Sequence, residues 1–198
     1  TGPNLILAHC IWLDENEMNI LAETGTSVVH CPSSNLKLAS GIARIPEMLK
    51  RGINVGLASD GAPCNNNMDQ FVEMRLSALI QKPLHGPTVL PAQQAFEMAT
   101  IGGARAMGLD SQIGSIEPGK KADLALVRLD GLHNTPSYEE QQIYSQLVYQ
   151  LRSADVTMTM VDGRVVMEKG QLVTIDGEEV QKKCREAIGR VKQRAGVN

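Results

Sequence analysis

The chain has 198 residues, of which 42% are hydrophobic, and its formal net charge is -3. This is enough for a substantial hydrophobic core, in one large domain or two small ones. Basic residues are interspersed with acidic ones, so no basic face is available and nucleic acid is not expected as a partner. No apolar segment approaches the roughly 20 residues that cross a bilayer, and no signal peptide is recognisable, so we expect no membrane association and a cytoplasmic location. The four cysteines lack the spacing of a metal site or disulfide scaffold and are expected as free thiols.

Three β-α units are predicted in the first half of the chain. Short apolar runs typical of buried strands are each followed by a segment with apolar residues at helical spacing. The strand-like runs are 4–10, 26–32 and 53–60, and the helix-like segments that follow them are 14–25, 41–52 and 66–82. Such alternation predicts a parallel sheet covered by helices, either an open doubly wound sheet or part of a β/α barrel. Another helix is predicted over 90–109, with Pro91 at its start.

The second half of the chain has a mostly β pattern. An alternating apolar strand is predicted at 122–129, after a turn that contains Gly and Pro. Further on, Asp162-Gly163 predicts a hairpin turn between two strands. A charged helix is predicted over 177–196, with one face formed by Val180, Cys184, Ile188 and Val191.

Each of the three predicted β-α units carries, at the carboxyl end of its strand, a side chain that can bind a metal or move a proton. These residues are His9, His30 and Asp60. In a parallel β/α sheet the carboxyl ends of the strands gather on one face, where sites are built. One such histidine is more often structural, but three polar residues in register favour a site. The Pro-Ser-Ser-Asn segment after His30 is expected to be a loop with ordinary turn chemistry.

Several blocks of the sequence resemble the amidohydrolase superfamily, in its triazine hydrolase and S-adenosylhomocysteine/5-methylthioadenosine deaminase branch. The blocks follow one another in order along nearly the whole chain: "LAHCIWL", "HCPSSNLKLASG", "GLASDGAPCNNNMDQFVEMRLSALIQK", "EMATIGGARAMGL" and "IGSIEPGKKADLALV". The resemblance implies an α/β fold, namely a metal-dependent β/α (TIM-like) barrel flanked by a small β-sandwich. Residues 1–112 would form the last three β/α units of the barrel, and residues 113–198 the C-terminal part of the sandwich with a terminal helix.

The resemblance also implies roles for the residues at the strand ends. Asp60 matches the aspartate that ligates one divalent metal, usually zinc, with iron and manganese as alternatives. It would also accept a proton from the attacking water and deliver it to the leaving amine. His9 matches a histidine that orients the hydroxide, although metal coordination or a packed core position remain alternatives for it. His30 and Asn35, with Ser34, would line the pocket as structural support or as substrate contacts.

Two neighbouring groups are expected to be structural. Asn65, Asn66 and Asn67 could shape the rim of the pocket, but capping of a helix that starts near Met68 is favoured. Glu73 and Arg75 are expected to form a solvated or packing pair on that helix rather than to act in catalysis.

The family's other ligands, a His-x-His pair and a fifth-strand histidine, do not occur in these residues. We therefore expect the chain to be a fragment that needs an N-terminal part of the barrel, to be inactive alone, and to belong to a homo-oligomeric enzyme. The expected activity of the complete enzyme is hydrolytic deamination of an aminated purine nucleoside such as S-adenosylhomocysteine or 5-methylthioadenosine. The alternatives are a guanine or triazine amidohydrolase or chlorohydrolase with another heteroaromatic substrate, and a non-catalytic α/β module that binds a small molecule.

Overall fold

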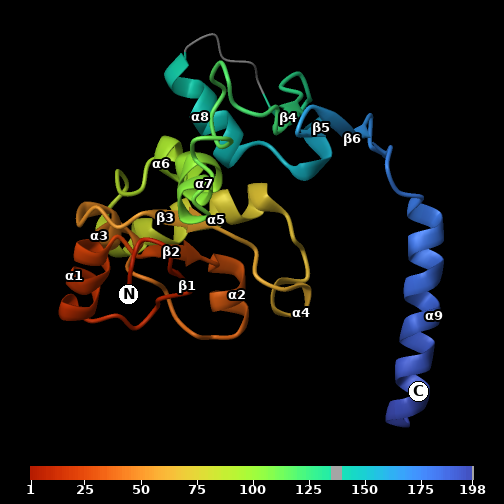
Figure 1. The fold of residues 1–198 in the computed structure, drawn as a ribbon, viewed down its shortest axis with the longest axis horizontal. Coiled ribbons are helices and arrows are strands. Elements are labelled where there is room, and N and C mark those ends of the chain that lie inside the picture. Colours follow the sequence, from red (N-terminus) through yellow and green to blue (C-terminus); the bar gives the residue numbers. More distant parts are fainter. Residues whose placement is uncertain (135–139, 198) are drawn as a thin grey trace. The chain divides into compact units, whose positions relative to one another are not determined.

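The computed structural model describes residues 1–134 and 140–197 and divides the chain into two compact units (Figure 1). The first unit comprises residues 1–121 and 128–155, and the second comprises residues 122–127 and the chain from 156 onward. This division differs from the segments 1–112 and 113–198 expected from the sequence. The difference arises because the chain returns to the first unit after its first strand in the second.

The first unit contains the predicted parallel sheet. Its strands are β1 (Ile6–Ala8), β2 (Ser27–His30) and β3 (Val55–Leu57), side by side in that order. Ile6 lies opposite Ser27, and Val28 lies opposite Val55. The β-α alternation, and with it the mixed α/β class, is therefore confirmed.

Helices cover the sheet and connect its strands. Those between the strands are α1 (Glu15–Thr24), α2 (Pro32–Lys37) and α3 (Ile45–Lys50). Asp14 caps α1 in a reciprocal capping box with Glu17, and Gly25 ends the helix in a left-handed conformation. The segment after His30 is not the expected loop: Pro32 lacks an N–H, which costs nothing in a first helical turn, so the segment forms α2.

After β3 the chain forms α4 (Ala62–Asn65) and the long α5 (Gln70–His85). The predicted capping of α5 by the asparagines is wrong. Asp69 is the N-cap, and its carboxylate accepts from the backbone N–H of Phe71. Asn65 is thereby free to take part in a different set of contacts near Asp60.

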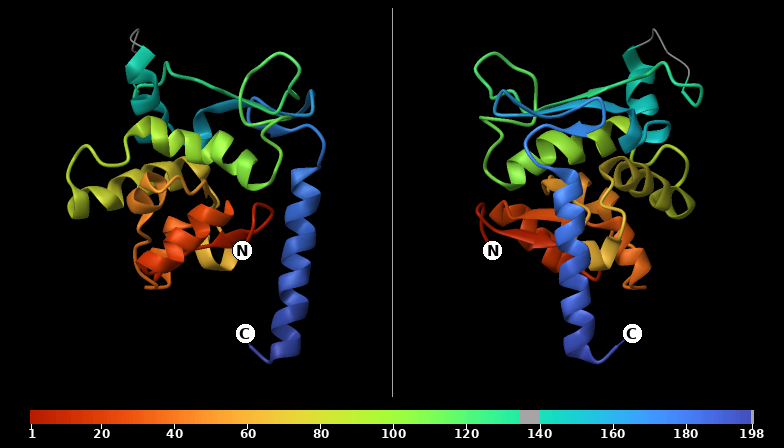
Figure 2. Two further views of the ribbon diagram at one scale, coloured as in Figure 1. Left: turned by 60° about the vertical axis from the view of Figure 1, so that its left-hand side comes forward. Right: turned by 90° about the vertical axis from the view of Figure 1, so that its right-hand side faces the viewer.

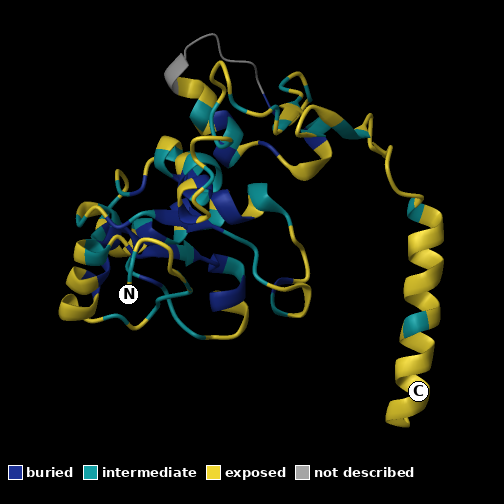
Figure 3. Ribbon diagram, viewed as in Figure 1, coloured by how far each residue is buried: buried dark blue, intermediate teal, exposed yellow. Residues whose placement is uncertain are grey.

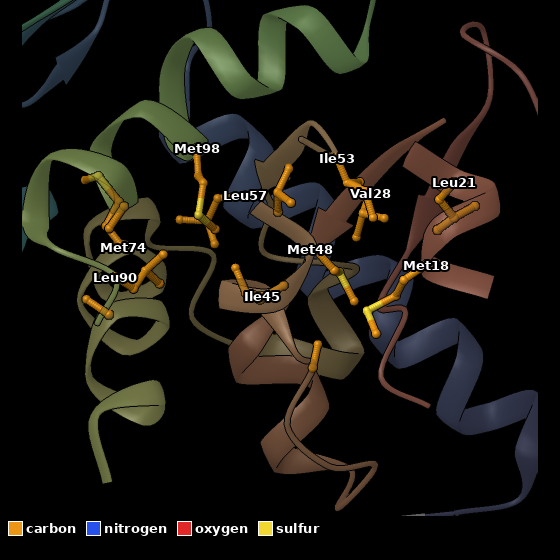
Figure 4. Packing of buried hydrophobic residues seen from close by; sticks show 14 of the residues in the cluster. Met18, Leu21, Val28, Ile45, Met48, Ile53, Leu57, Met74, Leu90 and Met98 are labelled. Carbon is orange, nitrogen blue, oxygen red and sulfur yellow. The ribbon is translucent and has the colours of Figure 1, made fainter. Parts of the chain in front are cut away.

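The core of the first unit lies between the sheet and its helices, as Figure 4 shows. Val28 and Leu57 contribute from the strands, and Met18, Met48 and Met74 from three different helices. The unbranched, polarizable methionine side chains fill irregular space between elements that meet at different angles. Because this packing comes from all three β-α units, it fixes their carboxyl-end loops relative to one another.

The predicted helix over 90–109 is interrupted by a wider turn. It consists of α6 (Ala92–Glu97), the π-helical turn η1 (Met98–Gly102) and α7 (Gly103–Ala106). At Gly102 the helix comes so close to β3 that a Cβ atom would lie 2.5 Å from the carbonyl oxygen of Val55. The amide of Asn54 donates to the carbonyl oxygen of Gly102 at 3.1 Å, which fastens this turn to the start of β3.

Two further helices of the first unit were also not predicted. The helix α8 (Glu140–Tyr149) lies in a part of the chain expected to be mostly β, and the short helix η2 (Ser153–Asp155) follows it. Val148 of α8 is completely buried in the core, and the ring of Tyr144 meets that of Phe96 edge to face at 5.5 Å between centroids. Packing against α6 therefore places α8 in the first unit.

The second unit is an antiparallel sheet followed by a long helix. The strands are β4 (Leu124–Val127), β5 (Val156–Val161), β6 (Arg164–Glu168) and β7 (Gln171–Leu172), in that order across the sheet. The predicted hairpin is confirmed, because Asp162 and Gly163 both have left-handed backbone conformations between β5 and β6.

The helix α9 (Gly177–Ala195) begins at the N-cap Asp176 and ends at Gly196, close to the predicted bounds. It is a single long helix (Figure 2), and none of its residues is buried (Figure 3). Within residues 1–134 and 140–197, no helix has both the length and the apolar character needed to cross a membrane.

The close contact at Gly102 predicts a position-specific effect of added methyl groups. Gly102→Ala should lower the free energy of unfolding by about 1–3 kcal/mol, because its Cβ would collide with backbone atoms that cannot rotate away. Gly103→Ala is the matched control: its Cβ would meet only ordinary contacts, beginning at 3.8 Å, and better helix propensity should make it neutral or stabilising. Thermal unfolding followed by circular dichroism measures both, and equal shifts for the two variants would contradict the assignment.

Candidate functional site

The polar residues predicted at the strand ends lie along one edge of the parallel sheet. His9 directly follows β1, His30 is the last residue of β2, and Asp60 lies three residues after β3. The backbone N–H of His9 donates to the carbonyl oxygen of Val29 at 2.9 Å, so the sheet pairing extends to His9 itself. Parallel pairing thus places the three residues at the same edge, as the sequence predicts.

The backbone at two of these residues is in the left-handed region. The φ angle is 68° at His9 and 63° at Asp60, values that are uncommon for residues other than glycine. Such conformations persist where the surrounding structure holds them, and they cluster at functional sites. In both cases the chain turns sharply away from the sheet and leaves a reactive side chain at its edge.

Two hydrogen bonds hold the carboxylate of Asp60. The hydroxyl of Ser34 donates to Oδ2 at 2.5 Å, and the backbone N–H of Gly61 donates to Oδ1 at 2.6 Å. These bonds, together with the charge of His9, hold the pKa of Asp60 below its usual value. Asp60 is therefore ionised at neutral pH and presents a negative charge at the edge of the sheet.

The imidazole of His9 lies between Asn35 and Asp60. Its Nδ1 is 2.7 Å from Oδ1 of Asn35, and because an amide oxygen can only accept, Nδ1 carries the proton. The other nitrogen, Nε2, is 3.9 Å from Oδ2 of Asp60. In the neutral ring Nε2 is an acceptor, so His9 can receive or orient a proton on a small molecule that lies beside Asp60.

His30 occupies a different environment from the other two residues. Its side chain is completely buried, and neither ring nitrogen has a hydrogen-bond partner among the described residues. Burial, with a smaller contribution from the charge of His9, lowers the pKa of His30 to about 3. The ring is thus neutral at physiological pH, and a substrate contact by His30 stays a prediction.

Two thiols near the strand ends are protonated at neutral pH. Burial is the main cause that raises the pKa of Cys31 to about 11, and burial also raises the pKa of Cys10. A nucleophilic cysteine needs a lowered pKa, so neither residue is a candidate nucleophile.

The predicted pairing of Glu73 with Arg75 and the predicted capping role of Asn65 are both wrong. Glu73 does not pair with Arg75 at the surface: it is completely buried and accepts hydrogen bonds from Ser33 and Asn65, whereas Arg75 donates to the carbonyl oxygen of Tyr149. Glu73 shares the buried stripe of α5 with Met74, Ser77, Ala78 and Gln81. Because three of these five side chains are polar, the hydrophobic pattern of the helix gave no signal that this face is buried.

The side chains at this edge are of types that bind a divalent metal. The carboxylate of Asp60 is ionised, and it lies beside the imidazole of His9; carboxylate and imidazole are both ligand types of zinc, iron and manganese. In the part of the chain that the structure describes, no group of three or more His, Cys, Asp or Glu side chains could hold a metal ion together.

The chain is similar in sequence to known proteins over most of its length. Residues 1–166 match the amidohydrolase family. The chain is 48% identical over 177 residues to a 5-methylthioadenosine/S-adenosylhomocysteine deaminase of Moorella thermoacetica, a match that covers 89% of this chain and 41% of that protein. The chain thus spans less than half the length of this curated relative.

Two solved structures are also similar to the chain. A zinc-bound adenosine deaminase from Xanthomonas campestris has a TM-score of 0.91 and 36% identity over 97% of this chain and 43% of that one. A zinc complex of the atrazine chlorohydrolase TrzN from Arthrobacter aurescens has a TM-score of 0.82 and 28% identity over 92% of this chain and 40% of that one.

The buried, neutral state of His30 predicts how stability depends on pH. Between pH 6.5 and 3 the unfolded chain binds a proton on this residue that the folded chain does not, so stability should fall as the pH drops below 6.5. From pH 7.5 to 5.0 this contribution amounts to about 2 kcal/mol. His30→Leu should remove it, and the variant should therefore lose less stability than the wild type over this range.

Urea unfolding at the two pH values measures the difference. His85→Leu, at an exposed position of α5, is the control and should keep the pH dependence of the wild type. An unchanged pH dependence in His30→Leu would show that His30 titrates equally in the folded and unfolded chains.

Proposed function

This chain belongs to the amidohydrolase family, and from that premise we propose that it forms part of a metal-dependent hydrolytic deaminase of aminated purine nucleosides. S-adenosylhomocysteine and 5-methylthioadenosine are the proposed substrates, and ammonia is the proposed leaving group. The observation that carries the proposal is the geometry of Asp60, an ionised carboxylate in a left-handed turn with Ser34 bonded to it and His9 beside it. Because the chain covers about two-fifths of its relative, the activity is that of the complete protein.

The choice of a purine over a triazine substrate is supported by the degree of similarity. Identity is 48% to the 5-methylthioadenosine/S-adenosylhomocysteine deaminase but 28% to the atrazine chlorohydrolase. The TM-score is likewise 0.91 to the adenosine deaminase and 0.82 to the chlorohydrolase. Dechlorination of a triazine and deamination of guanine are therefore the alternatives that an assay should include.

Asp60 and His9 would have different roles in the reaction: Asp60 would transfer a proton, and His9 would orient the water. A divalent metal held by Asp60 would lower the pKa of a water molecule toward about 7. Asp60 would accept a proton from the attacking water and return it to the leaving amine, while a C–O bond forms and the C–N bond breaks. His9, fixed by Asn35 at Nδ1, would use Nε2 to orient the water.

Hydrogen bonds to Asp60 suit it to the role of a metal ligand. Because they lower its pKa, the carboxylate is available as a ligand over the whole neutral range. His30 would support the pocket as a neutral group, because burial lowers its pKa to about 3.

The architecture of the complete protein is also a proposal. β1, β2 and β3 would be the last three strands of a β/α barrel, with the remaining metal ligands on the missing strands. In the described chain β1 and β3 each have a single neighbour, which fits a sheet that continues on both sides. The β4–β7 sheet would belong to the accompanying β-sandwich. Zinc is the proposed metal, since both similar structures contain it; the cytoplasmic location and the homo-oligomer stay predictions.

The first test is a direct assay of the protein expressed from its complete coding sequence. We expect about one zinc ion per chain by mass spectrometry, and ammonia release from S-adenosylhomocysteine and 5-methylthioadenosine in preference to guanine or an aminated triazine. Chloride release from atrazine instead would favour the chlorohydrolase alternative. Binding of a nucleoside without metal or turnover would favour a binding module and would overturn the proposal.

Asp60→Asn should abolish ammonia release and reduce the bound metal. The amide has the size of the carboxylate but carries no charge and cannot accept the proton. Asp110→Asn, which changes an exposed carboxylate, is the control and should keep both properties. Ammonia assay and metal analysis on the same preparations check the result, and full activity in Asp60→Asn would remove Asp60 from the mechanism.

His9→Gln should lower kcat by about 10²–10⁴ and leave the metal content unchanged, since His9 acts on the water and not as a ligand. Steady-state kinetics and metal analysis separate the two roles considered for this residue. Loss of metal together with activity would instead make His9 a ligand. His85→Gln is the control for a histidine away from the site.

A further inference from the structure

Glu73 is a buried carboxylate that neither the family match nor the proposed chemistry uses. It lies in the first turn of α5 and its side chain has no exposed surface. Burying a charged carboxylate is costly unless hydrogen bonds or other charges compensate it. Burial of Glu73 therefore costs free energy that its hydrogen bonds must offset.

Each oxygen of Glu73 accepts a hydrogen bond from a different segment of the chain. Oε2 accepts from the backbone N–H of Ser33 at 3.1 Å, and Oε1 accepts from the side-chain amide of Asn65 at 2.8 Å. Ser33 lies in the segment after β2, and Asn65 lies in the segment after β3. One carboxylate thus joins the two segments that follow neighbouring strands.

The segment after β2 contacts Asp60 through Ser34, the residue next to Ser33. Ser34 follows Ser33 in the chain, and its hydroxyl donates to Oδ2 of Asp60 at 2.5 Å. The next residue, Asn35, contacts Nδ1 of His9. The bond from Ser33 to Glu73 therefore fixes the start of α2 at the point where it presents both contacts.

The segment after β3 contacts Ser59, the residue that precedes Asp60. The amide nitrogen of Asn65 that donates to Glu73 also donates to the carbonyl oxygen of Ser59 at 2.8 Å. Ser59 immediately precedes Asp60. The oxygen of Asn65 accepts from the backbone N–H groups of Asn67 and Met68, so the side chain is held at both ends. These bonds support the left-handed turn at Asp60.

We propose that Glu73 is a positioning residue for Asp60. Its two oxygens hold together the segments after β2 and β3, and they thereby fix the carboxylate of Asp60 for metal binding and proton transfer. This rests on the proposed role of Asp60. A carboxylate is required because both partners are donors, and a glutamine would supply only one acceptor. The N-terminal end of α5 favours the negative charge.

A comparison of two variants on the same helix tests the proposal in the protein expressed from its complete coding sequence. Glu73→Gln keeps the size of the side chain but sets an NH₂ group against one of the two donors. The matched control is Gln81→Met: Gln81 is also completely buried on α5, but it donates to the carbonyl oxygen of Ala43, which is no part of this site. Both variants should lower the melting temperature.

Only Glu73→Gln should alter the site. We expect kcat to fall about 10–100-fold with little change in KM, and zinc affinity, measured by competition with a chelator, to fall by a similar factor. Asn65→Ala breaks the link from Glu73 to Ser59 and should act in the same direction, which keeps the proposal testable if Glu73→Gln does not fold. If Glu73→Gln and Asn65→Ala match Gln81→Met in kcat and zinc affinity, Glu73 is merely structural and the proposal is overturned.

The same measurements separate this proposal from the proposed function. A wild type that binds zinc but releases no ammonia would refute deamination, and zinc affinity would still test Glu73. A wild type that neither binds zinc nor releases ammonia would remove both proposals. An active wild type with unaffected variants would refute the role of Glu73 alone.

Discussion

The hydrogen bond from Ser34 to Asp60 is the contact on which the arrangement of this edge depends. It joins side chains that are 26 residues apart and come from the loops after two neighbouring strands. Parallel pairing of β2 and β3 brings the segments that follow them together, and this side-chain bond fixes the turn at Asp60 to the helix α2. The bond also lowers the pKa of Asp60, so the geometry and the charge of the edge have a common origin.

A polar layer lies beside the apolar core at this edge. His30, Asn35 and Glu73 are buried there, although the strands and helices around them contribute apolar residues to the core. Both oxygens of Glu73 and the oxygen of Asn35 have partners, and a shift of one segment would leave these buried atoms unpaired. The layer therefore favours one arrangement of the loops over many that an apolar interior would tolerate.

Much of this could be predicted from the sequence, and the failures have physical reasons. The β-α alternation, the Asp14 cap and the Asp162-Gly163 hairpin are encoded in local patterns that short segments determine. The strand-end positions of His9 and Asp60 followed from the same patterns. The helix α8 and the burial of Glu73 depend instead on partners far along the chain, such as Phe96 and Ser33.

The turn η1 determines how the two ends of the helix from Ala92 to Ala106 are rotated relative to each other. A π-helical turn contains one residue more than the α-helical path. Each residue turns an α-helix by about 100°, so deletion of one residue here would rotate Ala104 and Ala106 away from their buried positions. The extra residue of η1 therefore sets the rotational register between α6 and α7.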